Sequence, residues 1–248
     1  MRKVIHSVFL AVFVLGGELS WGASYDLSTI GASAWINGAY FSSQQIQPAG
    51  SGVLNSFVRL GANKAVIQGY NTAYRPVEFD EKTSPVFTRD LALSEVPLKM
   101  ISDNFYYEFL LDINQIQAND KNYLSLDMLQ LFVSGTSGNH GYPAGLGTKV
   151  YDLDTVKENN WIKLKDHQGG SGKADLFVYI PSSAIGGGSP YVYLFSKLGE
   201  NYANIGGYEE WGVLKGDGGG TLPPVPEPMS LLLIGVGILG LAAARKLK

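Results

Sequence analysis

The chain has 248 residues, with 19 basic and 22 acidic side chains, three histidines and no cysteine. The lack of cysteine excludes a disulfide framework, thiolate catalysis and cysteine-ligated metal sites, and the acidic balance excludes the basic face of a nucleic-acid binder, so we expect no nucleic-acid partner. Glycine (31 residues) and tyrosine (14 residues) are abundant and charged residues are only 17% of the chain, a composition typical of an extracellular β-protein with many turns.

The N-terminus has the pattern of a secretory signal peptide, which we predict over residues 1–23. Arg2 and Lys3 precede an apolar stretch at residues 8–15, and small residues follow it. Two cleavage sites fit the small-x-small rule, one within residues 20–22 and one within residues 22–24. The pattern predicts export through the Sec machinery and removal of the leader by signal peptidase.

Residues 24–215 predict an all-β body. In residues 104–113, Phe105, Tyr107 and Phe109 alternate with more polar neighbours, which is the period of a strand. Residues 123–133 also predict a strand, but its apolar parity changes between Met128 and Leu129, which requires a β-bulge or a bend. Further strands are predicted at residues 35–41, 53–60, 65–70, 90–101, 149–153, 161–164, 174–180, 191–197 and 209–214.

Short strands separated by glycine-rich turns favour one antiparallel β-sandwich with a jelly-roll-like arrangement. Two small β domains divided near residues 78–85 are the alternative. With 14 basic and 20 acidic residues once both chain ends are removed, the body has a net charge of −6. The Gly/Pro-rich residues 216–224 predict a linker.

The last segment, residues 225–248, combines a proline-flanked glutamate, an apolar run and a basic end. As a helix, the 16-residue run at 229–244 is about 24 Å long, short of the about 20 residues that span a typical bilayer. The basic end is expected in the cytoplasm, so both an ordinary anchor and a transient one stay open. The residues concerned are Pro226, Glu227 and Pro228, then Arg245, Lys246 and Lys248.

These three parts, in this order, resemble a PEP-CTERM sorting signal. The resemblance implies recognition by exosortase, a membrane protease-transpeptidase, with cleavage near Pro226–Pro228. It further implies a transient anchor in the inner membrane of a Gram-negative-type bacterium, followed by display on the cell surface or in an extracellular matrix of the kind found in biofilms and rich in exopolysaccharide. Strings within residues 100–214, such as 109–115 and 175–181, also resemble uncharacterised PEP-CTERM proteins.

The body shows no strong catalytic pattern, so we expect a non-enzymatic protein. It contains no Gly-x-Ser-x-Gly elbow and no His-Glu-x-x-His motif, and its two histidines fall in predicted loops. A secreted glycan-active hydrolase, which would need paired carboxylates, is the less favoured alternative. The residues weighed for such chemistry are His140, His167, Asp152, Asp154, Glu209 and Glu210.

Structural calcium is the site chemistry that the composition supports best, and no other cofactor is expected. Extracellular β-sandwiches use Ca²⁺ to fix loops, and carboxylate oxygens near strand ends are suitable ligands. We predict Asp112, Asp152 and Asp154 as candidate ligands, with Asn114 and Glu210 as further oxygen donors nearby.

Aromatic side chains provide the candidate ligand surface. Exposed rings stack on sugar faces, and we predict Trp161, Tyr191 and Tyr193 for this role; packing in the core is the alternative reading of the same residues. A calcium-stabilised carbohydrate-binding module is therefore the alternative to a matrix protein without a defined ligand, and extracellular polysaccharide is the expected partner.

Overall fold

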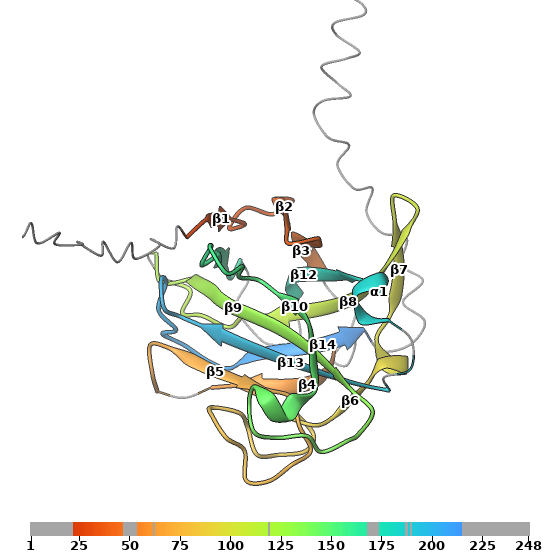
Figure 1. The fold of residues 1–248 in the computed structure, drawn as a ribbon. Helices are drawn as coiled ribbons and strands as arrows, with labels where there is room; N and C mark the ends of the chain where they lie inside the picture. The colour runs from red at the N-terminus through yellow and green to blue at the C-terminus, as the bar shows by residue number, and fades with distance from the viewer. Residues whose placement is uncertain are drawn as a thin grey trace, which may run out of the picture.

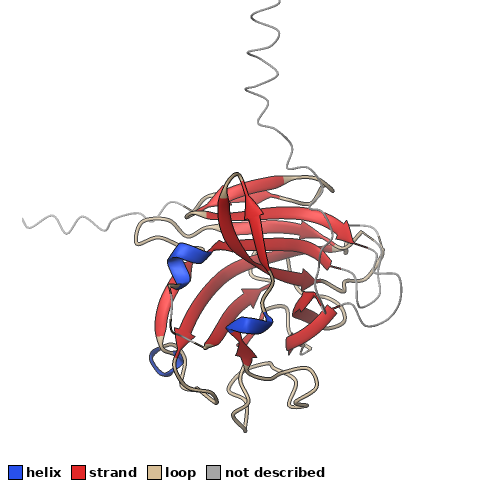
Figure 2. Cartoon of the chain, turned by 90° about the vertical axis from the view of Figure 1, so that its right-hand side faces the viewer, coloured by secondary structure: helices blue, strands red, loops and turns tan. Residues whose placement is uncertain are grey.

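The computed structural model describes residues 22–46, 54–61, 63–118, 120–167, 174–186, 188 and 190–214. These residues form a β-sandwich of two sheets, which Figures 1 and 2 show from two perpendicular directions. The all-β prediction is therefore confirmed, and the jelly-roll connectivity stays a prediction. Three short helical turns accompany the strands: η1 (Leu93–Glu95), η2 (Ala144–Leu146) and α1 (Ser182–Ile185).

The first sheet, sheet A, runs in the order β1-β11-β9-β13-β5, with β10 beside β9 and β6 beside β13. Its pairs are antiparallel except for β1 and β11, which run parallel. The strands of sheet A are β1 (Ser24–Asp26), β5 (Ile67–Tyr70), β6 (Leu91–Ala92), β9 (Tyr123–Ser134), β10 (Thr148–Asp152), β11 (Trp161–Lys165) and β13 (Tyr191–Leu198).

The second sheet, sheet B, runs in the order β2-β3-β12-β8-β14-β4, with β7 beside β8, and every pair in it is antiparallel. The chain repeatedly crosses between the sheets, so residues on both sides of 78–85 contribute to each of them. The strands of sheet B are β2 (Ser33–Ile36), β3 (Ala39–Ile46), β4 (Leu54–Leu60), β7 (Leu98–Ile101), β8 (Asn104–Asp112), β12 (Ala174–Pro181) and β14 (Glu209–Leu214).

The main core fills the space between the sheets. Phe109 and Leu111 of β8 meet Leu131 of β9 and Leu194 of β13 there, and all four are at most 1% exposed. These residues alternate along their strands with residues that face outward, as period-two patterning requires. Burial of this apolar surface, at about 25 cal/mol per Å², is the main force that holds the two sheets together.

The outer face of sheet A is divided into two halves. Over one half, the loops at residues 71–90 and 135–147 form a third layer, seen together at the bottom of Figure 1. Tyr142 of the second loop stacks on Phe195 of β13, with ring centroids 3.9 Å apart. We call this the covered half. The other half, crossed by β11 and the start of β9, carries no such layer among the residues that the structure describes, and we call it the open half.

The predicted change in the alternation of apolar residues along β9 is produced by a β-bulge. Lys197 of β13 lies opposite Met128 and the next residue, Leu198, lies opposite Leu126, so Asp127 is the extra residue. Leu126 and Leu129 both reach the core because the bulge resets the alternation. The prediction of a bulge or bend is therefore confirmed, and the bulge places Asp127 on the outer face of sheet A.

Two predicted strands are wrong because a turn divides each of them. Residues 35–41 form the end of β2 and the start of β3, joined by Asn37 and Gly38, whose φ angles are 50° and 85°. This Asn-Gly turn is the strongest local hairpin signal, since both positions require positive φ. Residues 90–101 likewise form β6, η1 and β7 rather than one strand.

Candidate functional site

The loops that join β4 to β5, β8 to β9 and β13 to β14 meet at one end of the sandwich, at the left of Figure 1. Gln115 ties them together: its Nε2 donates to Asn204 Oδ1 at 3.0 Å, and its Oε1 accepts from the Ile205 amide at 3.0 Å. The Asn204 amide in turn donates to the Ala65 carbonyl at 2.8 Å. We call this hydrogen-bonded group the loop end.

Four buried acids lie beneath the loop end. The backbone amides of residues 113–115 donate in turn to Asp175, Glu209 and Asp166 at 3.0, 2.9 and 2.9 Å, and Asp112 is buried close by. Burial raises the pKa of Asp175 and of Glu209 to about 8 each, and repulsion by Asp112 and Asp166 adds to the rise. Asp175 and Glu209 therefore favour their protonated forms at neutral pH. We call Asp112, Asp166, Asp175 and Glu209 the acid cluster.

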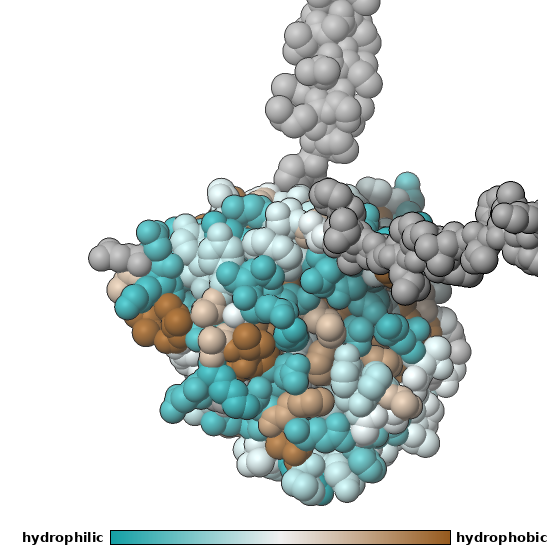
Figure 3. Space-filling view, turned by 60° about the vertical axis from the view of Figure 1, so that its left-hand side comes forward, coloured by the Kyte–Doolittle hydropathy of each residue, from teal (hydrophilic) through white to brown (hydrophobic). Residues whose placement is uncertain are grey.

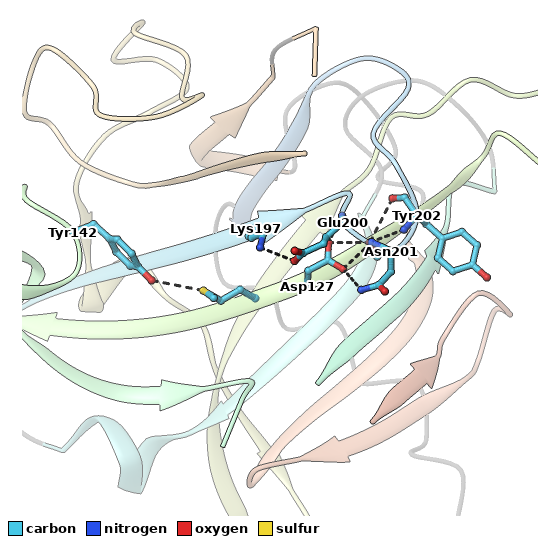
Figure 4. A network of polar contacts seen from close by, with 8 residues as sticks. Asp127, Tyr142, Lys197, Glu200, Asn201 and Tyr202 are labelled. Carbon is cyan, nitrogen blue, oxygen red and sulfur yellow. Dashed lines mark hydrogen bonds and ion pairs between the residues drawn. The ribbon is translucent and has the colours of Figure 1, made fainter. Parts of the chain in front are cut away.

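A second polar network fixes the loop between β13 and β14 to the bulge of β9 (Figure 4). Asp127, 4% exposed, accepts from the amides of Glu200 at 2.7 Å and Asn201 at 3.3 Å, and from the Asn201 side chain at 2.8 Å. Ser125 Oγ accepts from the Tyr202 amide at 2.9 Å. The bulge thus positions Tyr202, which leaves this loop toward the open half.

Three partly exposed rings gather on the open half. Tyr202 lies between Trp161 of β11 and Tyr123 of β9, with its ring centroid 5.9 Å from each of theirs. Lys163 Nζ stands 4.4 Å from the Tyr123 centroid and 4.9 Å from that of Tyr202, and Lys165 Nζ stands 5.4 Å from Tyr123. These five residues form what we call the aromatic patch.

The local sequence explains why the patch faces outward. Ile162 and Leu164 of β11 point into the core, so the alternating residues Trp161, Lys163 and Lys165 share the outer face. Lysine ammonium groups over ring faces are favourable cation–π contacts, and they hold the rings without burying them. On the side of the molecule in Figure 3, hydrophobic residues are scattered among hydrophilic ones rather than joined in one apolar area.

The structure separates the three residues predicted to stack on sugars. Trp161 belongs to the aromatic patch and is half-buried. Tyr193 lies in the covered half with no exposed surface, and its hydroxyl donates to the Thr136 carbonyl at 2.9 Å, so its ring is core and not ligand surface. Tyr191 is half-buried against the same cluster.

The three predicted calcium ligands do not converge. Asp112 belongs to the acid cluster of sheet B, whereas Asp152 and Asp154 belong to β10 and the loop after it. Asp152 pairs with Lys149 at 2.6 Å, and Asp154 accepts from the Asn160 amide at 2.7 Å. Among the described residues, no group of three or more His, Asp or Glu side chains has an arrangement that could hold a metal ion.

The residues considered for catalysis are also dispersed. His140 stacks on Tyr74 at 3.6 Å in the loops of the covered half, whereas His167 follows β11. Glu209 is buried in the acid cluster, and Glu210 pairs with Arg59 at 2.8 Å, as expected for adjacent strand residues that face opposite ways. Burial lowers the pKa of His167.

Sequence reasoning did not identify four members of the aromatic patch. Lys163 and Lys165 were detectable, because they share the strand parity of Trp161. Tyr123 and Tyr202 were not, since only the fold brings the start of β9 and the β13–β14 loop beside β11.

The predicted sorting residues, Pro226, Glu227, Pro228, Arg245, Lys246 and Lys248, lie outside the described residues, as do residues 1–21 of the predicted leader. Residues 224–246 match the family described as the PEP-CTERM protein-sorting motif. No curated protein and no solved structure matches the chain significantly. Within the described part of the chain, no helix has the length and apolar character needed to cross a membrane; the predicted segment 229–244 lies beyond it.

Proposed function

Because the chain carries a PEP-CTERM sorting motif, which implies an exported protein processed by exosortase, we propose that it is a non-enzymatic protein of the cell surface or extracellular matrix that binds polysaccharide. In this proposal the Sec machinery and signal peptidase export the chain, the inner membrane holds it until exosortase cuts near Pro226–Pro228, and the body then acts outside the cell.

The aromatic patch is the observation that carries the binding role. Trp161, Tyr123 and Tyr202 present three partly exposed rings on the open half, and planar rings stack on the apolar faces of sugars. The neighbouring ammonium groups of Lys163 and Lys165 can donate to sugar hydroxyls or carboxylates. A polar surface with a few rigid aromatic anchors is suited to a hydrated polymer.

The parallel pairing of β1 favours one of the two leader cleavage sites. The Trp161 amide donates to the Ala23 carbonyl at 3.0 Å, and Ser24 pairs with Trp161 in the register of β1 and β11. Cleavage after Gly22 keeps Ala23 and Ser24 and therefore keeps this pairing. Cleavage after Ser24 removes both residues and, with them, the pairing next to the patch. We therefore propose Ala23 as the first residue of the mature protein.

Intact mass of the protein from the host's surface and culture medium tests the sorting part of the proposal. We expect a chain that begins at Ala23 and ends near Pro226–Pro228, with or without an attached glycan. A mass that still includes Lys248 would instead mean a stable membrane anchor, and surface or matrix display would be ruled out.

Retention of the exported protein in gels that contain the host's extracellular polysaccharide tests the binding part. We expect Trp161→Ala and Tyr202→Ala to lose most of the retention. Trp35→Ala is the matched control, because Trp35 is 53% exposed on β2 of the other sheet. Equal retention of all variants, or loss in Trp35→Ala alone, would contradict a role for the patch.

A further inference from the structure

A pocket of about 740 Å³ opens at the loop end, between the chain before β5 and the chain before β14. It is distinct from the aromatic patch, although the same β13–β14 loop supplies Tyr202 to the patch and one wall to the pocket. Its volume lies in the range of small-molecule sites. The residues on which the argument depends are Asn63, Lys64, Lys82, Asn204, Gly207 and Tyr208.

The two walls of the pocket are bonded to each other beneath it. Asn204 Nδ2 donates to the Lys64 carbonyl at 3.1 Å, and the Gln115 side chain donates to Asn204 Oδ1 at 3.0 Å. Gly61 packs so closely on Tyr208 that an added Cβ would lie 2.2 Å from the ring. The pocket is therefore formed before a ligand arrives, and binding needs little ordering of the chain.

Among the described residues, one lysine of the pocket has no carboxylate partner. Lys64 pairs with Asp80 at 2.6 Å and Arg59 pairs with Glu210 at 2.8 Å. Lys82 has no ion pair with a carboxylate of the described residues; its Nζ stands 4.1 Å from the centroid of the Tyr208 ring. A hydrogen bond from Lys82 also lowers the pKa of the Tyr208 phenol.

The rest of the lining suits a ligand with hydroxyl groups. Asn63 and Tyr208 line the pocket with exposed side chains, and Gly207 packs so closely on Asn114 that an added Cβ would lie 2.6 Å from its side-chain nitrogen. A simple inorganic anion would fill only a small part of about 740 Å³. One ammonium group without a carboxylate partner among the described residues, beside neutral polar groups, fits a sugar that carries one carboxylate.

We propose that this pocket binds an acidic sugar unit, with the sugar carboxylate at Lys82 and its hydroxyls facing Asn63 and Tyr208. This inference rests on the proposed function, since it names the chemical class of polysaccharide that the protein binds. The pocket holds one charged unit, and the aromatic patch holds the chain of sugars by their faces.

Calorimetric titration of the exported protein with sodium glucuronate, glucose or sodium acetate tests the inference. We expect glucuronate to bind, glucose and acetate to bind at least tenfold more weakly, and Lys82→Gln to weaken glucuronate about tenfold, the effect of one lost charge-assisted hydrogen bond. Lys149→Gln is the matched control, because it removes a lysine of β10 that belongs neither to the pocket nor to the aromatic patch.

Equal affinity for glucuronate and acetate would show a site for simple anions and would overturn the sugar assignment. Glucuronate binding that Lys82→Gln leaves unchanged, or no binding at all, would overturn the pocket assignment. If the pocket fails but Trp161→Ala still abolishes retention by polysaccharide, the proposed function stands without it. If glucuronate binds at Lys82 and no polysaccharide is retained, the proposed function fails while the pocket stands.

Discussion

The covered and open halves of the outer face of sheet A hold the same kinds of side chain in different settings. In the covered half, Phe195 and Tyr193 are at most 2% exposed beneath the loops at 71–90 and 135–147. In the open half, Trp161, Tyr123 and Tyr202 meet at ring distances of 5.9 Å but remain partly exposed. The comparison teaches that the covering loops, rather than the aromatic residues themselves, decide whether a ring is core or ligand surface.

The covering layer holds itself in place by contacts between its two loops. Glu78 accepts from the amides of Gly141 and Tyr142, and Asp90 accepts from the Gly138 amide at 2.7 Å. The layer is thus a specific structure, and the open half has no counterpart of it among the described residues.

The largest expected effect comes from matched substitutions in the two halves. Phe195→Ala should lower the free energy of unfolding by about 4 kcal/mol, because it removes a buried ring and leaves a cavity under Tyr142. Tyr202→Ala should cost less than about 1 kcal/mol, as expected for a half-exposed residue, while it abolishes polysaccharide retention. Urea unfolding measures both values, and equal losses would show that the two halves do not differ as the comparison requires.

A second effect concerns pH, because the acid cluster lies beneath the loop end and not in the covered half. The folded pKa of Asp175 and of Glu209 is raised to about 8 from 3.8 and 4.5. The stability that these protonated acids contribute is complete below about pH 4 and is lost as the pH rises through 8. We expect a loss of at least about 3 kcal/mol between pH 5 and pH 9, because a two-unit shift of one carboxyl already contributes this much and both acids are shifted further.

Urea unfolding at the two pH values measures this loss, and Asp175→Asn should reduce it, because an amide cannot ionise. Hydrogen exchange should show where in the protein this stability is lost. At pH 9, after correction for the intrinsic exchange rate, the amides of residues 113–115 should lose protection before those of the loop at 135–147. Uniform loss of protection, or a stability that rises with pH, would contradict this account.

The sequence predicts those parts of the fold that local patterns encode. Alternation identified β8, and the parity change of β9 correctly required a bulge. The wrongly predicted strand at residues 35–41 contains the Asn37-Gly38 pair, which the sequence alone identifies as a turn signal. The parallel pair of β1, three residues long, leaves no pattern of its own, because its partner β11 is distant in the sequence.

The candidate site was less predictable for the same physical reason. The strand parity of Trp161 could be read from the sequence, but its exposure could not, since Tyr193 has an equally regular strand pattern and is buried. Burial there depends on loops whose sequences show no periodicity. Lys82 and Tyr208 are likewise joined only by the meeting of two loops.

A smaller effect tests how the open half is positioned. Asp127→Asn places amide hydrogens against the donors of Glu200 and Asn201, so it should cost about 2 kcal/mol and weaken polysaccharide retention by releasing Tyr202. Glu200→Gln is the control, because it removes only the surface ion pair with Lys197 and should cost less than about 1 kcal/mol. A destabilised Asp127→Asn protein with normal retention would show that the loop is not needed to place the ring.

The smallest expected effect tests whether the patch binds polysaccharide through the charge of Lys165 as well as through its aromatic rings. Lys165→Gln should change the free energy of unfolding by less than about 0.5 kcal/mol, since the side chain is partly exposed and stands 5.4 Å from the Tyr123 ring. If the ammonium binds sugar carboxylates, retention by an acidic polysaccharide should weaken and become less dependent on salt, because one screened charge pair is lost. Retention by a neutral polysaccharide should hardly change. An equal loss for acidic and neutral polymers would mean that Lys165 acts by holding Tyr123, and that the open half recognises sugar faces without regard to charge.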